Sequence, residues 1–292
     1  MNIMSSKTDN FIFTGTCRAG TGMVAAITGY LADQNCYICA LEQFDDESTD
    51  NFFMRAVFRP QQGSPTIEDI KKGFVSVAEE FSMEWKIHDP NIAIKALIMV
   101  SKYDHCLDDI LYRIRKGEFN IEIAAVISNH NDLRALVERE GHRFEYLPVT
   151  RENKPNQEQK LIEIMQKTDT ELVVLARYMQ ILSPTLTEQL RGRCINIHHS
   201  FLPGFKGAKP YHQAFHRGVK VIGATAHYVT SDLDEGPIIE QVVTRVDHNC
   251  KPEHLERIGR DSESIALARA IRYHIERRVF LDGNKTVVFL GG

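Results

Sequence analysis

The feature that most constrains the fold is a change in the pattern of apolar residues at Pro90. Beyond it, short apolar runs alternate with longer stretches whose apolar residues recur at helical spacing. We expect strands at 94–100, 121–127, 172–176, 194–197 and 221–229, and helices at 107–115, 132–139, 157–166, 184–190 and 210–216. This alternation favours a mostly parallel sheet with helices on both faces, so residues 92–292 are predicted to form a Rossmann-like α/β domain.

Residues 8–88 follow a different order, which predicts a separate domain. Strands are expected at 11–14, 37–44, 52–58 and 84–88, with helical spacing of the apolar residues at 23–33 and 66–81. The order is therefore βαββαβ, which is the split arrangement of ferredoxin-like domains.

Two parts of this N-terminal region resemble the ACT domain, a small regulatory module. They are Cys17 with 22–27, and 43–46 with 52–55. The resemblance implies an amino-acid effector bound at a domain interface. The family usually has Pro-Asp-Arg-Pro-Gly after the cysteine, whereas this chain has Arg-Ala-Gly-Thr-Gly at 18–22. Two roles stay open: a domain that binds an effector, or an architectural domain that supports a homo-oligomer, either a dimer or a tetramer.

Composition excludes several classes of partner. The net charge is −4, from 35 Lys and Arg against 39 Asp and Glu, and no basic stripe suggests a nucleic-acid partner. The apolar runs fall far short of the roughly 20 residues that span a bilayer, and the first ten residues lack the apolar core of a signal peptide. Six scattered cysteines do not suggest a disulfide framework. We expect a cytoplasmic protein with no membrane partner.

One pair of cysteines, Cys36 and Cys39, has the spacing of a metal-binding motif. A metal site would need a second pair or nearby histidines at ligand spacing, and none follows closely. The pair is interpreted as two small residues at the start of a strand.

The candidate active site begins in the predicted strand at 194–197. In such sheets ligands bind outside the carboxyl ends of the strands, which selects the loops after Val100, Ala176 and Ile197. Asn196 and His198 lie on the same face because side chains alternate along a strand, and Asp234 follows in a polar loop after the next strand.

These residue types suit transfer of an acyl group from an amide-like nitrogen. Asn196 could donate to a developing oxyanion, His198 could share that role and pass a proton, and Asp234 could hold the imidazole or activate water. The chain has neither a Gly-x-Ser-x-Gly nor a His-Glu-x-x-His motif, so direct attack by water or an amine is preferred. We expect no metal and no cofactor.

The Asn-x-His pair, the segment 200–207 and the segment 227–237 together resemble the formyltransferase family that uses 10-formyltetrahydrofolate, over roughly residues 92–285. The resemblance implies that Asn196, His198 and Asp234 are catalytic and that 177–184 lines the pterin pocket. The residues expected to contact the folate are Met179, Gln180, Ile181, Leu182, Ser200, Gly207, His227, Asp232 and Leu233. A buried core role is an equal alternative for His227. His199, His212 and His216 are interpreted as structural or surface residues, with His199 on the face opposite His198.

The family contains transferases and a hydrolase, so the acceptor is a separate question. A phosphorylated amine would need a glycine-rich turn at a helix N-terminus, but the segment 101–107 has no glycine and includes Asp104. A transfer-RNA acceptor would require a basic surface. The ACT-like domain and the segments 100–107 and 127–130 resemble the hydrolase branch, the formyltetrahydrofolate deformylases.

The resemblance implies hydrolysis of 10-formyltetrahydrofolate to formate and tetrahydrofolate, with the formate used for purine biosynthesis and the reaction balancing the one-carbon folate pools. Two alternatives remain. One is a formyltransferase with an amine acceptor, and the other is a binding module that senses folate.

Overall fold

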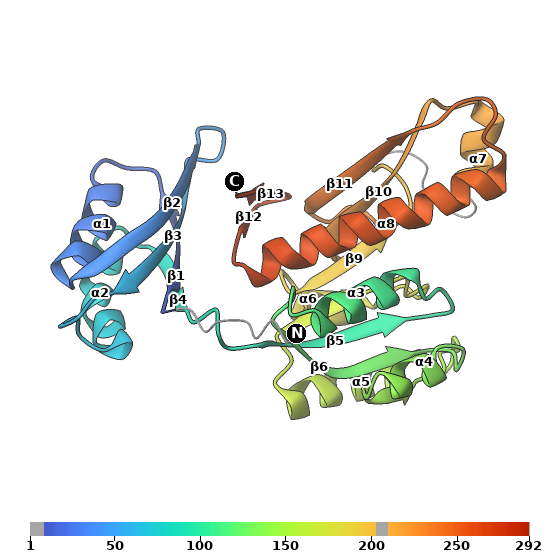
Figure 1. Ribbon diagram of the computed structural model, residues 1–292, viewed down its shortest axis with the longest axis horizontal. Helices are drawn as coiled ribbons and strands as arrows, with labels where there is room; N and C mark the ends of the chain where they lie inside the picture. The colour runs from blue at the N-terminus through green and yellow to red at the C-terminus, as the bar shows by residue number, and fades with distance from the viewer. Residues whose placement is uncertain (1–8, 203–209, 292) are drawn as a thin grey trace. The chain divides into compact units, whose positions relative to one another are not determined.

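The computed structural model describes residues 9–202 and 210–291, which group into two units (Figure 1). One unit contains residues 93–275 with 283–286, and the other contains the described residues up to Ile92 with 276–282 and the C-terminal residues from 287 onward. The N-terminal boundary lies close to the expected one. At the C-terminal end, residues 276–282 and those from 287 onward group with the N-terminal unit, whereas the sequence pattern assigns 92–292 to one domain.

The N-terminal unit is built on a four-stranded antiparallel sheet in the order β2-β3-β1-β4. Its strands are β1 (Phe11–Arg18), β2 (Cys36–Asp46), β3 (Asn51–Pro60) and β4 (Glu84–His88), and its helices are α1 (Met23–Asp33) and α2 (Ile67–Glu80). Both helices cover the same face of the sheet (Figure 1). Phe13, Ile27 and Phe74 are fully or almost fully buried between them. The predicted βαββαβ order is confirmed.

The second face of this sheet is in contact with the C-terminal segment. The rings of Phe53 and Phe280 meet edge to face with centroids 5.7 Å apart. Asp282 is 2% exposed and accepts hydrogen bonds from Thr49 Oγ1 at 3.1 Å and from Asn51 Nδ2 at 2.8 Å. These contacts explain why residues 276–282 group with the N-terminal unit. They join residues more than 200 positions apart, which a reading of local pattern does not detect.

The second unit carries Asn196, His198 and Asp234, the residues that the sequence predicts to be catalytic, and for that reason we call it the catalytic unit. It is built on a seven-stranded sheet in the order β11-β10-β9-β8-β5-β6-β7. The strands are β5 (Ile94–Val100), β6 (Ile121–Ser128), β7 (Phe144–Tyr146), β8 (Leu172–Leu175), β9 (Cys194–His198), β10 (Val221–Tyr228) and β11 (Ile238–Arg245). Neighbouring strands from β9 to β7 in this order are parallel, and β10 and β11 pair antiparallel. The predicted Rossmann-like, mostly parallel sheet is confirmed.

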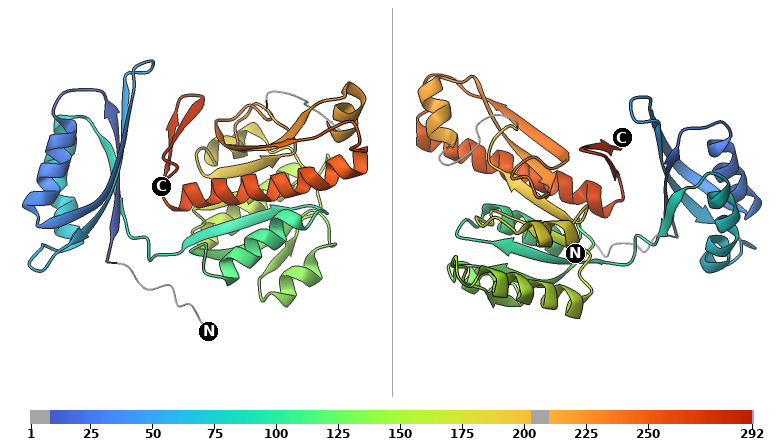
Figure 2. Two further views of the ribbon diagram at one scale, coloured as in Figure 1. Left: turned by 45° about the horizontal axis from the view of Figure 1, so that its top comes forward. Right: turned by 180° about the vertical axis from the view of Figure 1, so that it is seen from behind.

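Helices cover both faces of this sheet. The helices are α3 (His105–Arg115), α4 (Arg134–Arg139), α5 (Lys154–Thr168), α6 (Pro184–Gln189), α7 (Pro210–Arg217) and α8 (Pro252–Ile275). The long helix α8 runs across β9, β10 and β11 and also packs against α3 (Figures 1 and 2). Helices α5 and α6 bury Leu161 and Leu186 in a cluster with Leu97 and Leu175.

Several elements were not predicted from the sequence, namely β7, β11, α8 and the short C-terminal pair β12 (Val279–Asp282) and β13 (Lys285–Val288). The strand order reverses between β8 and β5, which places a crevice at the ends of these two strands. Within the described residues, no helix combines the length and apolar character that crossing a bilayer requires.

The acid stability of the N-terminal unit should depend on His88. Burial, followed by the positive charges of Arg277 and Lys86, lowers the pKa of His88 from 6.5 to about 4, and its Nε2 lies 3.2 Å from Thr14 Oγ1. The folded chain therefore favours the neutral imidazole, while the unfolded chain binds a proton near pH 6.5. Unfolding takes up that proton, so stability falls as pH decreases from about 6.5 to about 4.

We expect His88→Gln to remove this dependence of stability on pH. The difference in unfolding free energy between pH 7 and pH 4 should shrink by roughly 3 kcal/mol, which is the size of the pKa shift in energy units. Urea unfolding followed by the fluorescence of Trp85, the single tryptophan, reports on this unit. His216→Gln, at an exposed position of α7, serves as the control. Equal acid sensitivity of the wild type and His88→Gln would contradict the assignment.

Candidate active site

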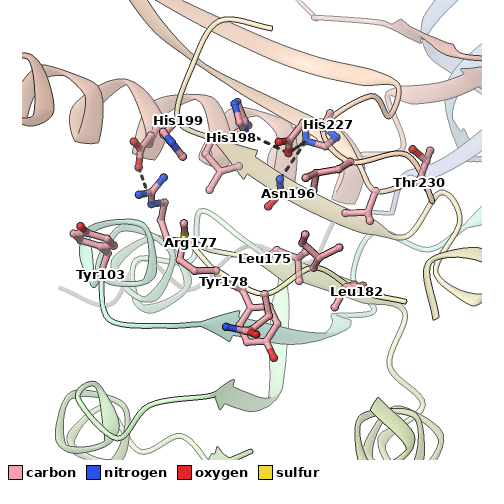
Figure 3. A pocket seen from close by; sticks show the side chains of 18 of the residues that line it. Tyr103, Leu175, Arg177, Tyr178, Leu182, Asn196, His198, His199, His227 and Thr230 are labelled. Carbon is pink, nitrogen blue, oxygen red and sulfur yellow. Dashed lines mark hydrogen bonds and ion pairs between the residues drawn. The ribbon is translucent and has the colours of Figure 1, made fainter. Parts of the chain in front are cut away.

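A cavity of about 530 Å³ lies in the catalytic unit, over the ends of β8 and β9 (Figure 3). One end is lined by residues 179–182 and 229–233, and we call it the loop end. The other end is lined by Tyr103, Arg177 and other polar residues, and we call it the polar end. Asn196, His198 and Asp234 line the same cavity. The structure therefore brings together the three residues that the sequence identified as catalytic candidates.

The pairing of β9 with β10 sets the position of Asn196. It lies opposite His227, next to a register shift between Ala226 and His227 in β10. Burial lowers the pKa of His227, so its imidazole is neutral. His227 Nδ1 donates to the carbonyl oxygen of Tyr228 at 2.9 Å, and Nε2 then accepts from Asn196 Nδ2 at 3.2 Å. Within the described part of the chain, the second N–H of the Asn196 amide makes no hydrogen bond.

Asp234 reaches His198 from a loop that turns back after β10. His198 Nδ1 lies 3.2 Å from Asp234 Oδ1, and both side chains are largely buried. Burial raises the pKa of Asp234, but the hydrogen bond and charge of His198 outweigh it, so the pKa is lowered overall. The carboxylate is therefore ionised at neutral pH. His198 Nε2 is buried and has no hydrogen-bonding partner among the described residues.

The loop that carries Asp234 has unusual backbone geometry. Asp234 has a φ of 57°, in the left-handed region that side chains with a Cβ rarely adopt. Two residues later, a Cβ on Gly236 would lie 1.7 Å from the carbonyl oxygen of Tyr228. Only glycine allows this approach, so Gly236 is required for the position of Asp234.

The segment after β8 lines the loop end of the cavity. Met179, Gln180, Ile181 and Leu182 all contribute, as do Asp232 and Leu233 from the other loop. The backbone of this segment is anchored by the buried hydroxyl of Ser101. It accepts from Met179 N at 3.0 Å and donates to Asn129 Oδ1 at 2.7 Å.

Ser200 and Gly207 are the two other residues that the sequence predicts to contact the folate. Ser200 is buried and does not line the cavity. Its carbonyl oxygen accepts from Thr225 Oγ1 at 3.0 Å, and Thr225 Oγ1 in turn accepts from Leu202 N at 3.1 Å. Ser200 therefore shapes the loop after β9, and its contact with the folate stays a prediction. Gly207 lies outside the described residues.

The polar end contains a group of residues that sequence reasoning missed, built around Glu263 of α8. The carboxylate is 1% exposed and accepts from His105 Nε2 at 2.8 Å and from the Tyr211 hydroxyl at 2.9 Å, and Arg177 Nε lies 3.4 Å away. Burial raises its pKa, but the hydrogen bond from His105 and the charge of Arg177 outweigh it and lower the pKa. We call Tyr103, His105, Arg177, Tyr211 and Glu263 the Glu263 cluster.

The Glu263 cluster is tightly packed. A Cβ on Gly259 of α8 would lie 1.9 Å from the Tyr211 hydroxyl, so this glycine leaves the room that Tyr211 needs. Among the described residues, only His105, Cys106 and Glu263 lie close enough together to bind a metal ion. Burial raises the pKa of the Cys106 thiol far above its usual range, and Glu263 is already paired. The set is therefore poorly suited to a metal.

His199 lies in the cavity, contrary to our expectation. Its ring stacks on that of His198 with centroids 4.9 Å apart, and burial together with the charge of Arg177 lowers its pKa to about 4. Strand β9 ends at His198, so the alternation of faces does not extend to His199. His212 and His216 are on α7; His212 Nε2 lies 3.8 Å from Glu256, and His216 is exposed.

Comparison with known proteins identifies the family. Residues 94–271 match the family described as formyl transferase. The chain is 50% identical to a formyltetrahydrofolate deformylase of Corynebacterium sp. (strain P-1), over 95% of this chain and 97% of the relative. The chain belongs to the formyl transferase family.

Solved structures of the family resemble the chain to different extents. The formyltetrahydrofolate deformylase of Burkholderia mallei ATCC 23344 has a TM-score of 0.92 at 51% identity and covers 96% of this chain and 99% of its own. Glycinamide ribonucleotide transformylase 1 of Symbiobacterium toebii has a TM-score of 0.63 at 30% identity and covers 69% of this chain and 96% of its own. The chain is thus similar to the first over nearly its whole length, and to the second over about two thirds.

Gly236→Ala should separate Asp234 from His198. Because the added Cβ would overlap the Tyr228 carbonyl, the loop must shift, and we expect the unfolding free energy of the catalytic unit to fall by about 2 kcal/mol or more. The NMR signal of the His198 Nδ1 proton, hydrogen-bonded to Asp234, should disappear or move. Gly29→Ala is the control, since a Cβ there meets no atom within 4 Å. An unchanged signal and unchanged stability in Gly236→Ala would refute the requirement.

Proposed function

We infer that the chain hydrolyses 10-formyltetrahydrofolate to formate and tetrahydrofolate. The observation that carries this inference is the His198–Asp234 pair beside the Asn196 amide in one cavity. Relatives that align with this chain over nearly its whole length are named formyltetrahydrofolate deformylases, which favours hydrolysis over transfer to an amine.

We propose that the loop end of the cavity receives the folate. Met179, Ile181 and Leu233 are each more than half exposed there, which provides apolar surface for a ring system. Burying such surface is favourable by about 25 cal/mol per Å². The formyl group then lies next to Asn196 and His198.

Each catalytic residue has a separate part in the proposed mechanism. Water attacks the formyl carbon, and the carbonyl oxygen becomes an oxyanion that accepts from the free N–H of Asn196, a contact worth about 3 to 4 kcal/mol in other enzymes. His198 takes the proton of the water and passes it to the folate nitrogen as the carbon–nitrogen bond breaks. Formate and tetrahydrofolate result, and no metal or cofactor takes part.

The lowered pKa of Asp234 bears on its role in this mechanism. A carboxylate whose pKa lies well below the working pH is a weak proton acceptor. Asp234 is therefore better suited to orienting the imidazole and stabilising its charge than to removing the proton from water. His227, through its contact with Asn196, positions the amide.

The remaining proposals concern the setting of the reaction. We propose that the enzyme acts in the cytoplasm, that its formate supplies purine biosynthesis, and that the reaction balances the one-carbon folate pools. We also propose a homo-oligomer assembled through the ACT-like unit, because edge strand β2 exposes Tyr37, Leu41 and Phe44. An amino-acid effector remains a second role proposed for that unit.

Formate release without any added acceptor tests the proposed function. The wild type should release formate from 10-formyltetrahydrofolate in stoichiometric yield, measured with formate dehydrogenase. Asp234→Asn should lower kcat by roughly a hundredfold or more while folate affinity changes little, because the substitution removes the charge that holds His198. Asp247→Asn, at an exposed position after β11 that does not line the cavity, is the control.

Other outcomes would select other functions. Formate or formyl transfer that appears only when glycinamide ribonucleotide is added would indicate a transferase. Folate binding without turnover would indicate a sensor. Full activity in Asp234→Asn would remove this residue from the chemistry.

A further inference from the structure

The polar end of the cavity is lined by side chains from five separate parts of the fold. Tyr103 and His105 come from the turn after β5 and the start of α3, Arg177 follows β8, Tyr211 belongs to α7, and Glu263 belongs to α8. Figure 3 shows Tyr103 and Arg177 on one side of the site, and Leu182 and Thr230 on the other. The proposed mechanism uses none of the residues of the Glu263 cluster.

Arg177 has a strained backbone conformation and buried hydrogen-bond donors, and both are energetically unfavourable for a purely structural residue. Its φ is 64°, in the left-handed region that favours glycine, and its side chain is 10% exposed. Its guanidinium lies over the ring of Tyr103 at 5.1 Å, and its Nε and Nη1 are buried without a hydrogen-bond acceptor among the described residues. Strained backbone and unsatisfied buried donors occur together mainly at functional sites.

The cluster makes the polar end unsuitable for a second substrate. The Arg177 side chain forms part of the wall at this end of the cavity, and its charge is paired with a buried carboxylate. Because the guanidinium is paired with Glu263, it attracts an anionic acceptor such as a phosphorylated amine only weakly, and a neutral amine would have to displace it. Water needs only the space beside His198.

We propose that Arg177, held by the other members of the Glu263 cluster, excludes amine acceptors and thereby makes water the acceptor of the formyl group. Arg177 is thus a specificity-determining residue, and this proposal rests on the proposed hydrolase function. It follows that removing its side chain opens the cavity to an amine. The amine nitrogen then bonds to the formyl carbon, the bond from that carbon to the folate nitrogen breaks, and the amine proton passes to the folate nitrogen.

Arg177→Gly tests the proposal directly, because glycine adopts the observed φ without strain. The variant is given 10-formyltetrahydrofolate and glycinamide, a molecule smaller than the arginine side chain. Formyl-glycinamide is measured by mass spectrometry and formate enzymatically. The ratio of formyl-glycinamide to formate should rise at least roughly tenfold over the wild type. Asp169→Gly is the matched control, since Asp169 also has a positive φ of 51° but lies at the end of α5 and does not line the cavity.

A second variant tests the same proposal in case Arg177→Gly does not fold. Tyr103→Ala removes a half-exposed ring from beneath the guanidinium, so Arg177 can move and the ratio should rise by a smaller factor. An unchanged ratio in both variants, or in Tyr103→Ala alone if Arg177→Gly does not fold, would overturn the proposal. This failure differs from that of the proposed function, because the wild type would still release formate without an acceptor.

Discussion

The register between β9 and β10 is the constraint on which the site depends. It places His227 opposite Asn196 and Thr225 opposite His198, so one imidazole fixes the amide and one hydroxyl fixes the loop that follows. A shift of one residue would move every side chain of β10 to the other face. The register shift between Ala226 and His227 contributes to this arrangement. It bends the end of β10, from which the loop of Asp234 turns back.

Periodic signals in the sequence predicted most of the fold. The strand at Ile94–Val100 and the helix at Met23–Asp33 were predicted with the bounds that the structure has, because each carries an uninterrupted apolar pattern of the right period. Alternation also placed Asn196 and His198 on one face. The proximity of Asp234 came from the family resemblance and not from the pattern, since a loop has no period from which its path could be inferred.

The residues missed by sequence reasoning have tertiary causes. Helix α8 was not predicted, because many of its buried positions are small or polar, among them Gly259, Ser262 and Ala266, and give no apolar stripe. In the sequence, Glu263 of this helix has the pattern of an exposed charged residue. Its burial depends on His105, which comes from a distant part of the chain. Arg177 is the first residue of the segment 177–184 that the resemblance assigns to the pterin pocket, but its positive φ and its pairing with Glu263 are visible only in three dimensions.

The carboxylates of Glu263 and Asp234 both line the cavity but have different partners. The two ends of the cavity therefore differ in how their charge is paired. Glu263 is engaged by Arg177, His105 and Tyr211, so its charge is already neutralised and is not available to a substrate. Asp234 has His198 as its closest partner, at 3.2 Å, and His227 Nε2 lies 3.9 Å from the same carboxylate oxygen, so its charge acts on the two imidazoles around Asn196. His199 lies between the two systems, and burial with the charge of Arg177 keeps it neutral above a pKa of about 4. Near neutral pH a neutral ring therefore stacks against His198, so this contact between the polar end and His198 adds no second charge.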